Sequence, residues 1–276
     1  MMPAIKREKE KKFKAATLSH FKARGRHSLP WRVTQTPYRV LVSELMLQQT
    51  QVDRVVPKFN AFVNAFPDVE SLARASLSAV YKQWSGLGYN RRAKYLRDAA
   101  HAIAKSGGVI KDDLEYLHAL PGIGPYTAGA IRAFAYGHPE PFIETNIRTA
   151  VLHHFFPKKK AVRDEEILAI LSHLKPTKGK MARDWYAALM DYGAHLKKQG
   201  VRLNAQSRGY TKQTKFEGSL RQVRGAIMRE LGKGGVAKAP LQRRIGKGMP
   251  EVTQALAGLI KNGLVQRRGT KFYLAK

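Results

Sequence analysis

Residues 120–129 read Leu-Pro-Gly-Ile-Gly-Pro-Tyr-Thr-Ala-Gly, and this stretch says more about the fold than any other. Gly122 and Gly124, one residue apart, permit a tight turn and a close approach of the backbone to a ligand. Pro125 suits the first position of a helix. The free amides at such a helix start bind phosphate. The stretch therefore predicts a phosphate-binding turn before a helix, although an ordinary helix–helix connection would carry the same glycines.

Apolar residues on either side of this turn recur at the three- and four-residue spacing of amphipathic helices. Helices are predicted over 37–48, 52–66, 91–104, 125–136, 145–156, 164–174 and 181–196. Strand alternation is not found in this part of the sequence, and Gly and Pro mark the breaks between segments. Residues 1–196 are therefore predicted to form an all-α globule of many short helices.

The chain changes character at residue 197. Residues 197–215 hold six Lys or Arg and no acid, so we interpret 197–218 as a basic linker or a DNA-facing loop. Amphipathic helices are predicted over 219–231 and 250–262, followed by a hairpin that turns at Gly269. Residues 219–276 therefore suggest a small winged-helix-like module. With 13 Lys or Arg and two Glu, this module carries a net charge of +11.

The composition favours a polyanionic partner. The 276 residues carry 50 Lys+Arg against 20 Asp+Glu, a formal net charge of +30. The absence of cysteine excludes disulfides, a cysteine nucleophile, and thiolate-bound zinc or iron–sulfur sites. The sequence has neither an apolar run of about 18 residues for a membrane span nor a secretory signal. We expect a protein that binds nucleic acid in the cytoplasm, associated with the nucleoid if prokaryotic, and no membrane partner.

Four segments carry a resemblance to a known family. In chain order they are Leu-Pro-Trp-Arg at 29–32, Ser-Glu-Leu-Met-Leu-Gln-Gln-Thr-Gln-Val at 43–52, Gly-Leu-Gly-Tyr at 86–89, and the 120–129 stretch. Together they resemble the helix-hairpin-helix DNA glycosylase superfamily, and the second segment resembles its MutY-type adenine DNA glycosylases. The similarity covers about residues 27–196.

This resemblance implies a two-lobed α-helical globule, here with the winged-helix-like module appended. It also implies a base-excision repair enzyme that acts on duplex DNA as a monomer. Such an enzyme flips an adenine out of a mispair with 8-oxoguanine or guanine and hydrolyses its N-glycosidic bond. The expected product is an abasic site.

Hydrolysis of this bond needs a proton for the leaving base and a negative charge beside the oxocarbenium-like sugar, and two carboxylates can supply both. Glu44, inside the apolar helix predicted at 37–48, is the expected half-buried acid. The resemblance implies that it protonates the adenine ring nitrogen and later helps to activate water. The alternative for Glu44 is a surface glutamate on a helix edge.

Glu144 is the expected second carboxylate and stands just before the helix predicted at 145–156. The family usually carries Asp here, so the side chain is one methylene longer in this chain. The alternative is a charge that only stabilises the helix start through the helix dipole. Asn146 matches the family Asn that positions water or the carboxylate.

Tyr126 separates two kinds of glycosylase. Bifunctional relatives resembling endonuclease III have a lysine at this place that forms an imine with the sugar, and tyrosine cannot form one. We therefore expect base hydrolysis without strand cleavage. The resemblance also implies that Trp31 and Arg32 hold the adenine by stacking and hydrogen bonding.

Further DNA contacts are implied around the flipped base. Gln48 and Tyr89 match family positions that insert into the duplex and fill the gap in the base stack. Gln49 and Thr50 are expected nearer to the partner strand of the mispair.

Besides Glu144, the sequence departs from the family in three places. Most relatives hold an iron–sulfur cluster through four cysteines, at places that fall here near Lys197, Asn204, Ser207 and Gln213. We therefore expect no metal and no cofactor, with a monovalent cation at the 120–125 hairpin as the alternative. Ala187 stands where relatives often carry a Glu or Gln that touches the adenine. Residues 219–276 are also too few for the Nudix-like domain with which the family reads 8-oxoguanine.

Two other functions remain as alternatives. One is a glycosylase for thymine or uracil opposite guanine, and Glu44 argues against it because pyrimidine-excising relatives generally lack an acid there. The other is a non-catalytic DNA-binding protein on the same scaffold. A non-catalytic protein would be expected to have lost both carboxylates, whereas this chain keeps Glu44 and Glu144.

Overall fold

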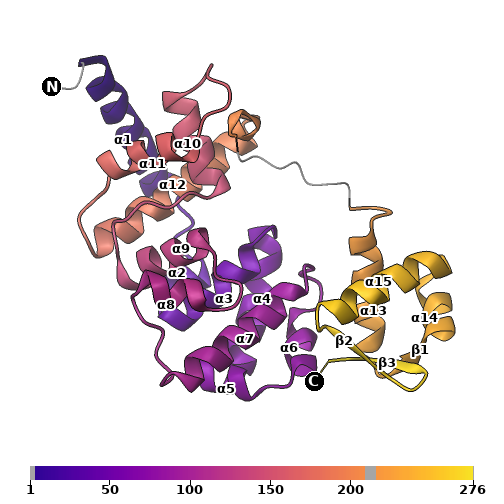
Figure 1. The fold of residues 1–276 in the computed structure, drawn as a ribbon. Helices are drawn as coiled ribbons and strands as arrows, with labels where there is room; N and C mark the ends of the chain where they lie inside the picture. The colour runs from indigo at the N-terminus through magenta and orange to yellow at the C-terminus, as the bar shows by residue number, and fades with distance from the viewer. Residues whose placement is uncertain (1–3, 209–215, 276) are drawn as a thin grey trace. The chain divides into compact units, whose positions relative to one another are not determined.

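The computed structural model describes residues 4–208 and 216–275, with side chains from residue 7 onward. Helices dominate the described chain, whose only strands form a small three-stranded sheet near the C-terminus (Figure 1). The predicted all-α class is therefore confirmed. The described residues fall into two compact units, one drawn from 1–40, 112–118 and 123–212 (unit 1) and the other from 41–111, 119–122 and 213–276 (unit 2).

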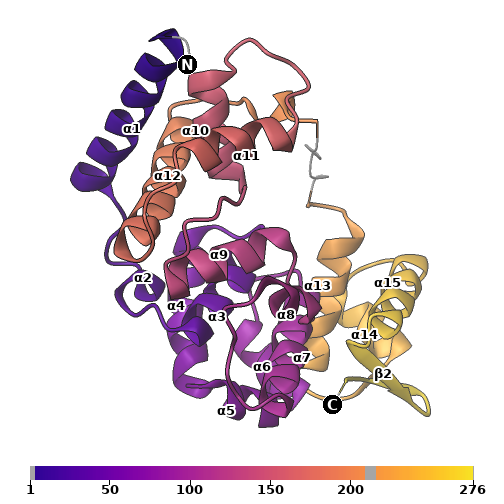
Figure 2. The same cartoon turned by 60° about the vertical axis from the view of Figure 1, so that its left-hand side comes forward.

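Three helices of unit 1 pack against the long helix α12 (Lys180–Lys198). Helices α1 (Ala4–Arg24), α9 (Pro125–Tyr136) and α10 (Thr145–Phe155) pack against α12, and α11 (Asp164–His173) packs against α10 (Figure 2). The short helices α2 (Pro30–Val33) and α8 (Leu114–Ala119) belong mainly to this unit, as does a 3-10 turn, η1 (Asn204–Gln206). Its core holds Phe13 and Tyr186, both fully buried.

Unit 2 begins within α3 (Pro37–Leu47), whose residues from 41 onward belong to it. It continues through α4 (Val52–Ala65), α5 (Val69–Arg74), α6 (Leu77–Trp84) and α7 (Arg91–Lys105). Helix α7 packs against α5 and α6, and α4 packs against α6. Phe59 and Phe62 of α4 and Trp84 of α6 are fully buried, and the ring centroids of Phe62 and Trp84 lie 6.1 Å apart, so aromatic packing joins α4 to α6.

The C-terminal residues of unit 2 contain three helices and a three-stranded sheet in the described range 216–275, and the winged-helix-like module stays a prediction. The elements are α13 (Leu220–Leu231), β1 (Val236–Ala237), α14 (Lys238–Ile245), α15 (Met249–Lys261), β2 (Val265–Arg268) and β3 (Lys271–Leu274). The sheet order is β1-β3-β2, with Arg268 opposite Lys271 across the hairpin. Gly269 has φ +56°, which a side chain would disfavour, so the turn falls where predicted.

The predicted helices match the observed ones to within two residues at each end, whereas several other helices were not predicted. Those missed are α1, α2, α5, α6, α8 and α14. Helices α5 and α6 are only six and eight residues long, too short to show a period, and they depend on capping by Asp68 and Ser76. Within the described residues, no helix has the length and apolar character needed to cross a membrane.

Candidate functional site

Glu44 lies in the C-terminal half of α3 and is 3% exposed. Its neighbours Leu41 and Leu45 are fully buried. The side chain is therefore more buried than the half-buried position predicted, and it is not a surface glutamate on a helix edge. A carboxyl group kept in such surroundings is suited to hold or deliver a proton.

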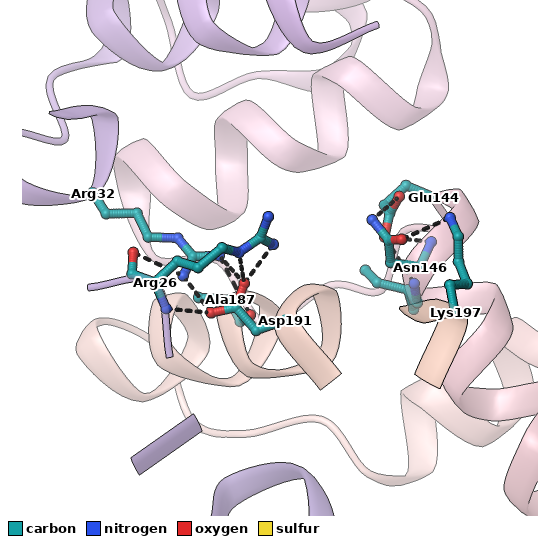
Figure 3. A network of polar contacts seen from close by, with 8 residues as sticks. Arg26, Arg32, Glu144, Asn146, Ala187, Asp191 and Lys197 are labelled. Atoms are coloured by element: carbon teal, nitrogen blue, oxygen red, sulfur yellow. Dashed lines mark hydrogen bonds and ion pairs between the residues drawn. The ribbon is translucent and has the colours of Figure 1, made fainter. Parts of the chain in front are cut away.

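Glu144 is the N-cap residue of α10. Its Oε1 accepts hydrogen bonds from the backbone amides of Asn146 (2.7 Å) and Ile147 (2.8 Å), as Figure 3 shows in part. Its Oε2 accepts from the Thr145 hydroxyl (3.1 Å) and from Asn146 Nδ2 (3.2 Å). The longer arm of Glu thus folds back to cap the helix, so the stabilising contact is present. A catalytic role of the same carboxylate stays a prediction.

Lys197, near the end of α12, joins the hydrogen-bonded group formed by Glu144 and Asn146. Its Nζ donates to Asn146 Oδ1 at 2.8 Å (Figure 3). Burial lowers the pKa of Lys197, while the negative charge of Glu144 acts in the opposite direction. Gly193 permits the close approach of α12 to α10, because a Cβ on it would lie 1.9 Å from the Asn146 carbonyl oxygen. Nothing in the sequence pattern predicted the contact with Lys197.

Arg32 in α2 forms an ion pair with Asp191, a carboxylate on α12. Its Nη1 and Nη2 donate to Asp191 Oδ2 (2.7 Å) and Oδ1 (3.0 Å), and Arg26 binds the same carboxylate (Figure 3). Burial alone would raise the pKa of Asp191, but the hydrogen bonds and charges of Arg32 and Arg26 lower it. Trp31 beside them is 7% exposed. Arg32 therefore has a structural role at Asp191, and its contact with adenine stays a prediction.

The hairpin between α8 and α9 has the predicted backbone. Gly122 has φ +79°, and a Cβ on it would lie 2.6 Å from Tyr95 Cβ, so only glycine fits. Gly124 is the N-cap of α9 and Pro125 its first residue. A Cβ on Gly124 would meet no atom within 4 Å. Tyr126, half-buried in the first turn, lies 5.9 Å from the Phe142 ring, centroid to centroid.

The two segments predicted to enter the duplex belong to unit 2. One follows α3 and contains Gln48, Gln49 and Thr50, and the other precedes α7 and contains Tyr89. Gln49 (φ 55°) and Tyr89 (φ 47°) both have the left-handed backbone that side chains rarely adopt. Tyr89 is 36% exposed, the guanidinium carbons of Arg92 and Arg221 lie 5.5 and 5.6 Å from its ring centroid, and Arg221 also donates to its hydroxyl.

The residues after α12 do not fit an iron–sulfur cluster. The donor set lacks a thiolate, because the chain has no cysteine. Asn204 bonds to Thr149 Oγ1 (3.0 Å), and Ser207 Oγ accepts from Arg148 Nη1 (2.5 Å). These bonds attach the first part of the predicted linker to α10. The fourth place, Gln213, lies outside the described residues.

The predicted residues divide between the units. In unit 1 lie Trp31, Arg32, Gly124, Tyr126, Glu144 and Asn146, and in unit 2 lie Glu44, Gln48, Gln49, Thr50, Tyr89 and Gly122. Across the described residues, no three or more His, Asp or Glu side chains are placed to hold a metal ion. The cofactor prediction, including the alternative of a monovalent cation, remains a prediction.

Helices joined by this hairpin, together with a buried acid on α3, define a helix-hairpin-helix protein with the residues expected of a DNA glycosylase. Residues 42–177 match the HhH-GPD superfamily base excision DNA repair protein family. These residues are similar to this family, in agreement with the resemblance of the three quoted motifs that they contain.

Several curated relatives are adenine DNA glycosylases by name. The chain is 38% identical to that of Mycobacterium tuberculosis over 179 residues, which cover 62% of this chain and 57% of the relative. It is 39% identical to that of Mycolicibacterium smegmatis over 175 residues, 62% of this chain and 58% of the relative. The human protein is 37% identical over 145 residues, 49% of this chain and 26% of its own. The match thus spans less than two thirds of these relatives.

Solved structures share the fold. A thermostable thymine-DNA glycosylase aligns with a TM-score of 0.60 at 24% identity, over 68% of this chain and 88% of its own. Endonuclease III from a non-covalent DNA complex aligns with a TM-score of 0.54 at 16% identity, over 70% and 85%. At these identities the alignments support the fold.

Proposed function

We propose that this protein is a monofunctional adenine DNA glycosylase of base-excision repair. Its substrate is adenine opposite 8-oxoguanine or guanine in duplex DNA, and its product is an abasic site. The observation that carries this proposal is Glu44, a carboxyl group 3% exposed on α3 within the residues that match the family. The names of the relatives supply the base, because several are adenine DNA glycosylases.

In the proposed reaction Glu44 donates a proton to the adenine ring nitrogen, which turns the base into a better leaving group. The glycosidic bond breaks, and the electron pair goes to the base. Glu144 stabilises the positive charge that develops on the sugar, and Asn146 orients it or the attacking water. Glu44 then accepts a proton from this water as the new C–O bond forms.

An abasic site on an uncut strand is the proposed product, because residue 126 is a tyrosine and offers no amine that could form an imine with the sugar. The amine of Lys197 contacts Asn146 of the proposed site. In the proposal it positions Asn146 and does not form an imine. Trapping by borohydride on adenine duplexes tests this assignment, because an imine with any lysine would become a stable crosslink.

The proposed substrate complex uses the loops of unit 2 for the duplex. Gln48 and Tyr89 fill the gap left by the extruded base, while Gln49 and Thr50 contact the partner strand. Trp31 and Arg32 hold the adenine, and the amides after Gly122 and Gly124 bind a phosphate. The formal charge of +30 supports a DNA partner. We further propose that one copy of the chain, without an iron–sulfur cluster, is sufficient.

A cleavage assay on end-labelled duplexes tests the base and the reaction together. Duplexes with single A:8-oxoguanine, A:G, A:C, T:G and U:G pairs are incubated with the protein, with and without hot alkali. We expect alkali-dependent cleavage at adenine opposite 8-oxoguanine or guanine. Cleavage at T:G or U:G instead would support a pyrimidine glycosylase, and binding without any cleavage would support a non-catalytic protein.

A further inference from the structure

Arg92, the second residue of α7, is 6% exposed and carries a buried guanidinium group. Its Nη1 donates to the carbonyl oxygens of Leu45 (2.7 Å), Met46 (2.8 Å) and Gln48 (2.6 Å). The first two lie in the last turn of α3, whose carbonyls have no partner within the helix. A cation at this place also complements the negative end of the helix dipole. Arg92 thus caps the C-terminal end of α3 and also bonds to the carbonyl of Gln48, the first residue after the helix.

The other nitrogens of Arg92 reach a second segment. Nη2 donates to the Gly88 carbonyl (3.0 Å), and Nε lies 3.4 Å from the Tyr89 carbonyl. Nη2 also donates to the Thr50 hydroxyl at 3.0 Å. One planar group therefore joins residues 45–50 to residues 87–89 within unit 2.

Both segments joined by Arg92 contain strained backbone. Gln49 and Tyr89 have φ values of 55° and 47°, and each is next to a residue whose carbonyl accepts from Arg92. Such conformations persist only where the surroundings impose them. The fork of an arginine can bind several carbonyls in fixed directions, which a lysine ammonium cannot do. Burial lowers the pKa of Arg92 to about 10, so the group stays charged at neutral pH.

We propose that Arg92 is a positioning residue that holds the 48–50 and 86–89 segments in the shape in which Gln48 and Tyr89 enter a duplex. This inference rests on the proposed function for the role of the two segments. Arg92 itself touches neither base nor sugar. It prearranges both segments before DNA arrives, which lowers the cost of ordering them on binding.

The test compares Arg92→Lys with Arg74→Lys, which makes the same change at the exposed end of α5. Both variants keep the charge, so affinity for undamaged duplex should equal that of the wild type. In Arg92→Lys we expect faster hydrogen exchange in peptides covering 45–52 and 85–90 and weaker preference for an A:8-oxoguanine duplex. Single-turnover excision should fall by about 10²-fold, the effect of a small misplacement. Arg74→Lys should change none of these.

A merely structural Arg92 would lower the melting temperature and raise exchange throughout unit 2, leaving the preference for the mispair unchanged. That result overturns the proposal, as does wild-type exchange in the two segments. If the wild type excises no adenine, the proposed function fails, while exchange and duplex preference still decide the role of Arg92. Should Arg92→Lys not fold, Thr50→Ala removes one partner of the guanidinium. Faster exchange confined to the two segments then supports the proposal, and unchanged exchange overturns it.

Discussion

Glu44 is the side chain on which the proposed chemistry depends most. Burying a carboxyl group costs free energy, and a folded protein retains one mainly where it is paired or functional. With 3% of its surface exposed on α3, between the fully buried Leu41 and Leu45, Glu44 is such a buried carboxyl group. The resemblance of the 43–52 motif to the glycosylase family is the basis on which we propose proton transfer as its role.

Glu44→Gln should keep the shape of the side chain and remove the proton donor. We expect single-turnover adenine excision to fall by about 10²–10⁴-fold, the usual worth of general acid catalysis. Binding to the duplex should be retained. Glu70→Gln, an exposed position on α5, is the matched control and should excise at the wild-type rate. Equal rates for Glu44→Gln and the control would remove Glu44 from the mechanism.

Variants at Glu144 can distinguish a role in capping α10 from a role in catalysis. Glu144→Gln keeps an oxygen that can accept from the amides of Asn146 and Ile147, so the melting temperature should change little. It removes the negative charge beside the sugar, so excision should fall by about 10²-fold or more. Glu144→Asp restores the residue usual in the family and should retain activity. A Gln variant that excises at the wild-type rate with unchanged binding would show that Glu144 only caps α10.

The sequence could single out these carboxylates as candidates because each lies in a local motif. It could not identify the contact of Arg92 with Leu45 or that of Lys197 with Asn146, because these partners lie 47 and 51 residues apart in the sequence. A lysine or arginine in a chain with 50 of them carries no local signal. The pairing of Arg32 with Asp191 was missed for the same reason, since only the packing of α12 brings the two together.

At the level of elements, periodicity predicted the longer helices because each buries one apolar face. Helix α1 was missed because ten of its 21 residues are Lys, Arg or Glu, and its packing depends on a narrow stripe around Phe13 and Thr17. The segment after α12 was interpreted as a linker from its charge. Residues 204–207 instead bond to α10, contacts that composition cannot reveal.

A substitution at Ser207 tests whether residues 204–207 stabilise unit 1 in the absence of a metal. Ser207 is 5% exposed, accepts from Arg148 and donates its backbone amide to Asn204. Ser207→Ala removes the side-chain bond, so the free energy of unfolding should fall by about 1–2 kcal/mol. Ser19→Ala on the exposed face of α1 is the control, with a change within about 0.5 kcal/mol. Chemical denaturation with and without a chelator measures both. No loss for Ser207→Ala would show that the segment contributes nothing.

At the scale of the whole molecule, charge dominates. A chain with a formal charge of +30, of which residues 219–276 carry +11, should bind the DNA backbone largely by releasing counterions. If it neutralises about 6–10 phosphates, duplex affinity should fall by about 10³–10⁵-fold between about 50 and 200 mM salt. Fluorescence anisotropy with an undamaged duplex measures this slope. A flat response would contradict binding through the backbone.

The most direct test of the account is the release of free adenine from an A:8-oxoguanine duplex by iron-free protein under single-turnover conditions. Mass spectrometry of the small-molecule fraction identifies the base, and hot alkali counts the abasic sites on the same sample. The account predicts one free adenine for each alkali-labile site, intact strands before alkali, and no crosslink with borohydride. No adenine release by folded, DNA-binding protein, or strand breaks and a borohydride crosslink without alkali, would contradict it.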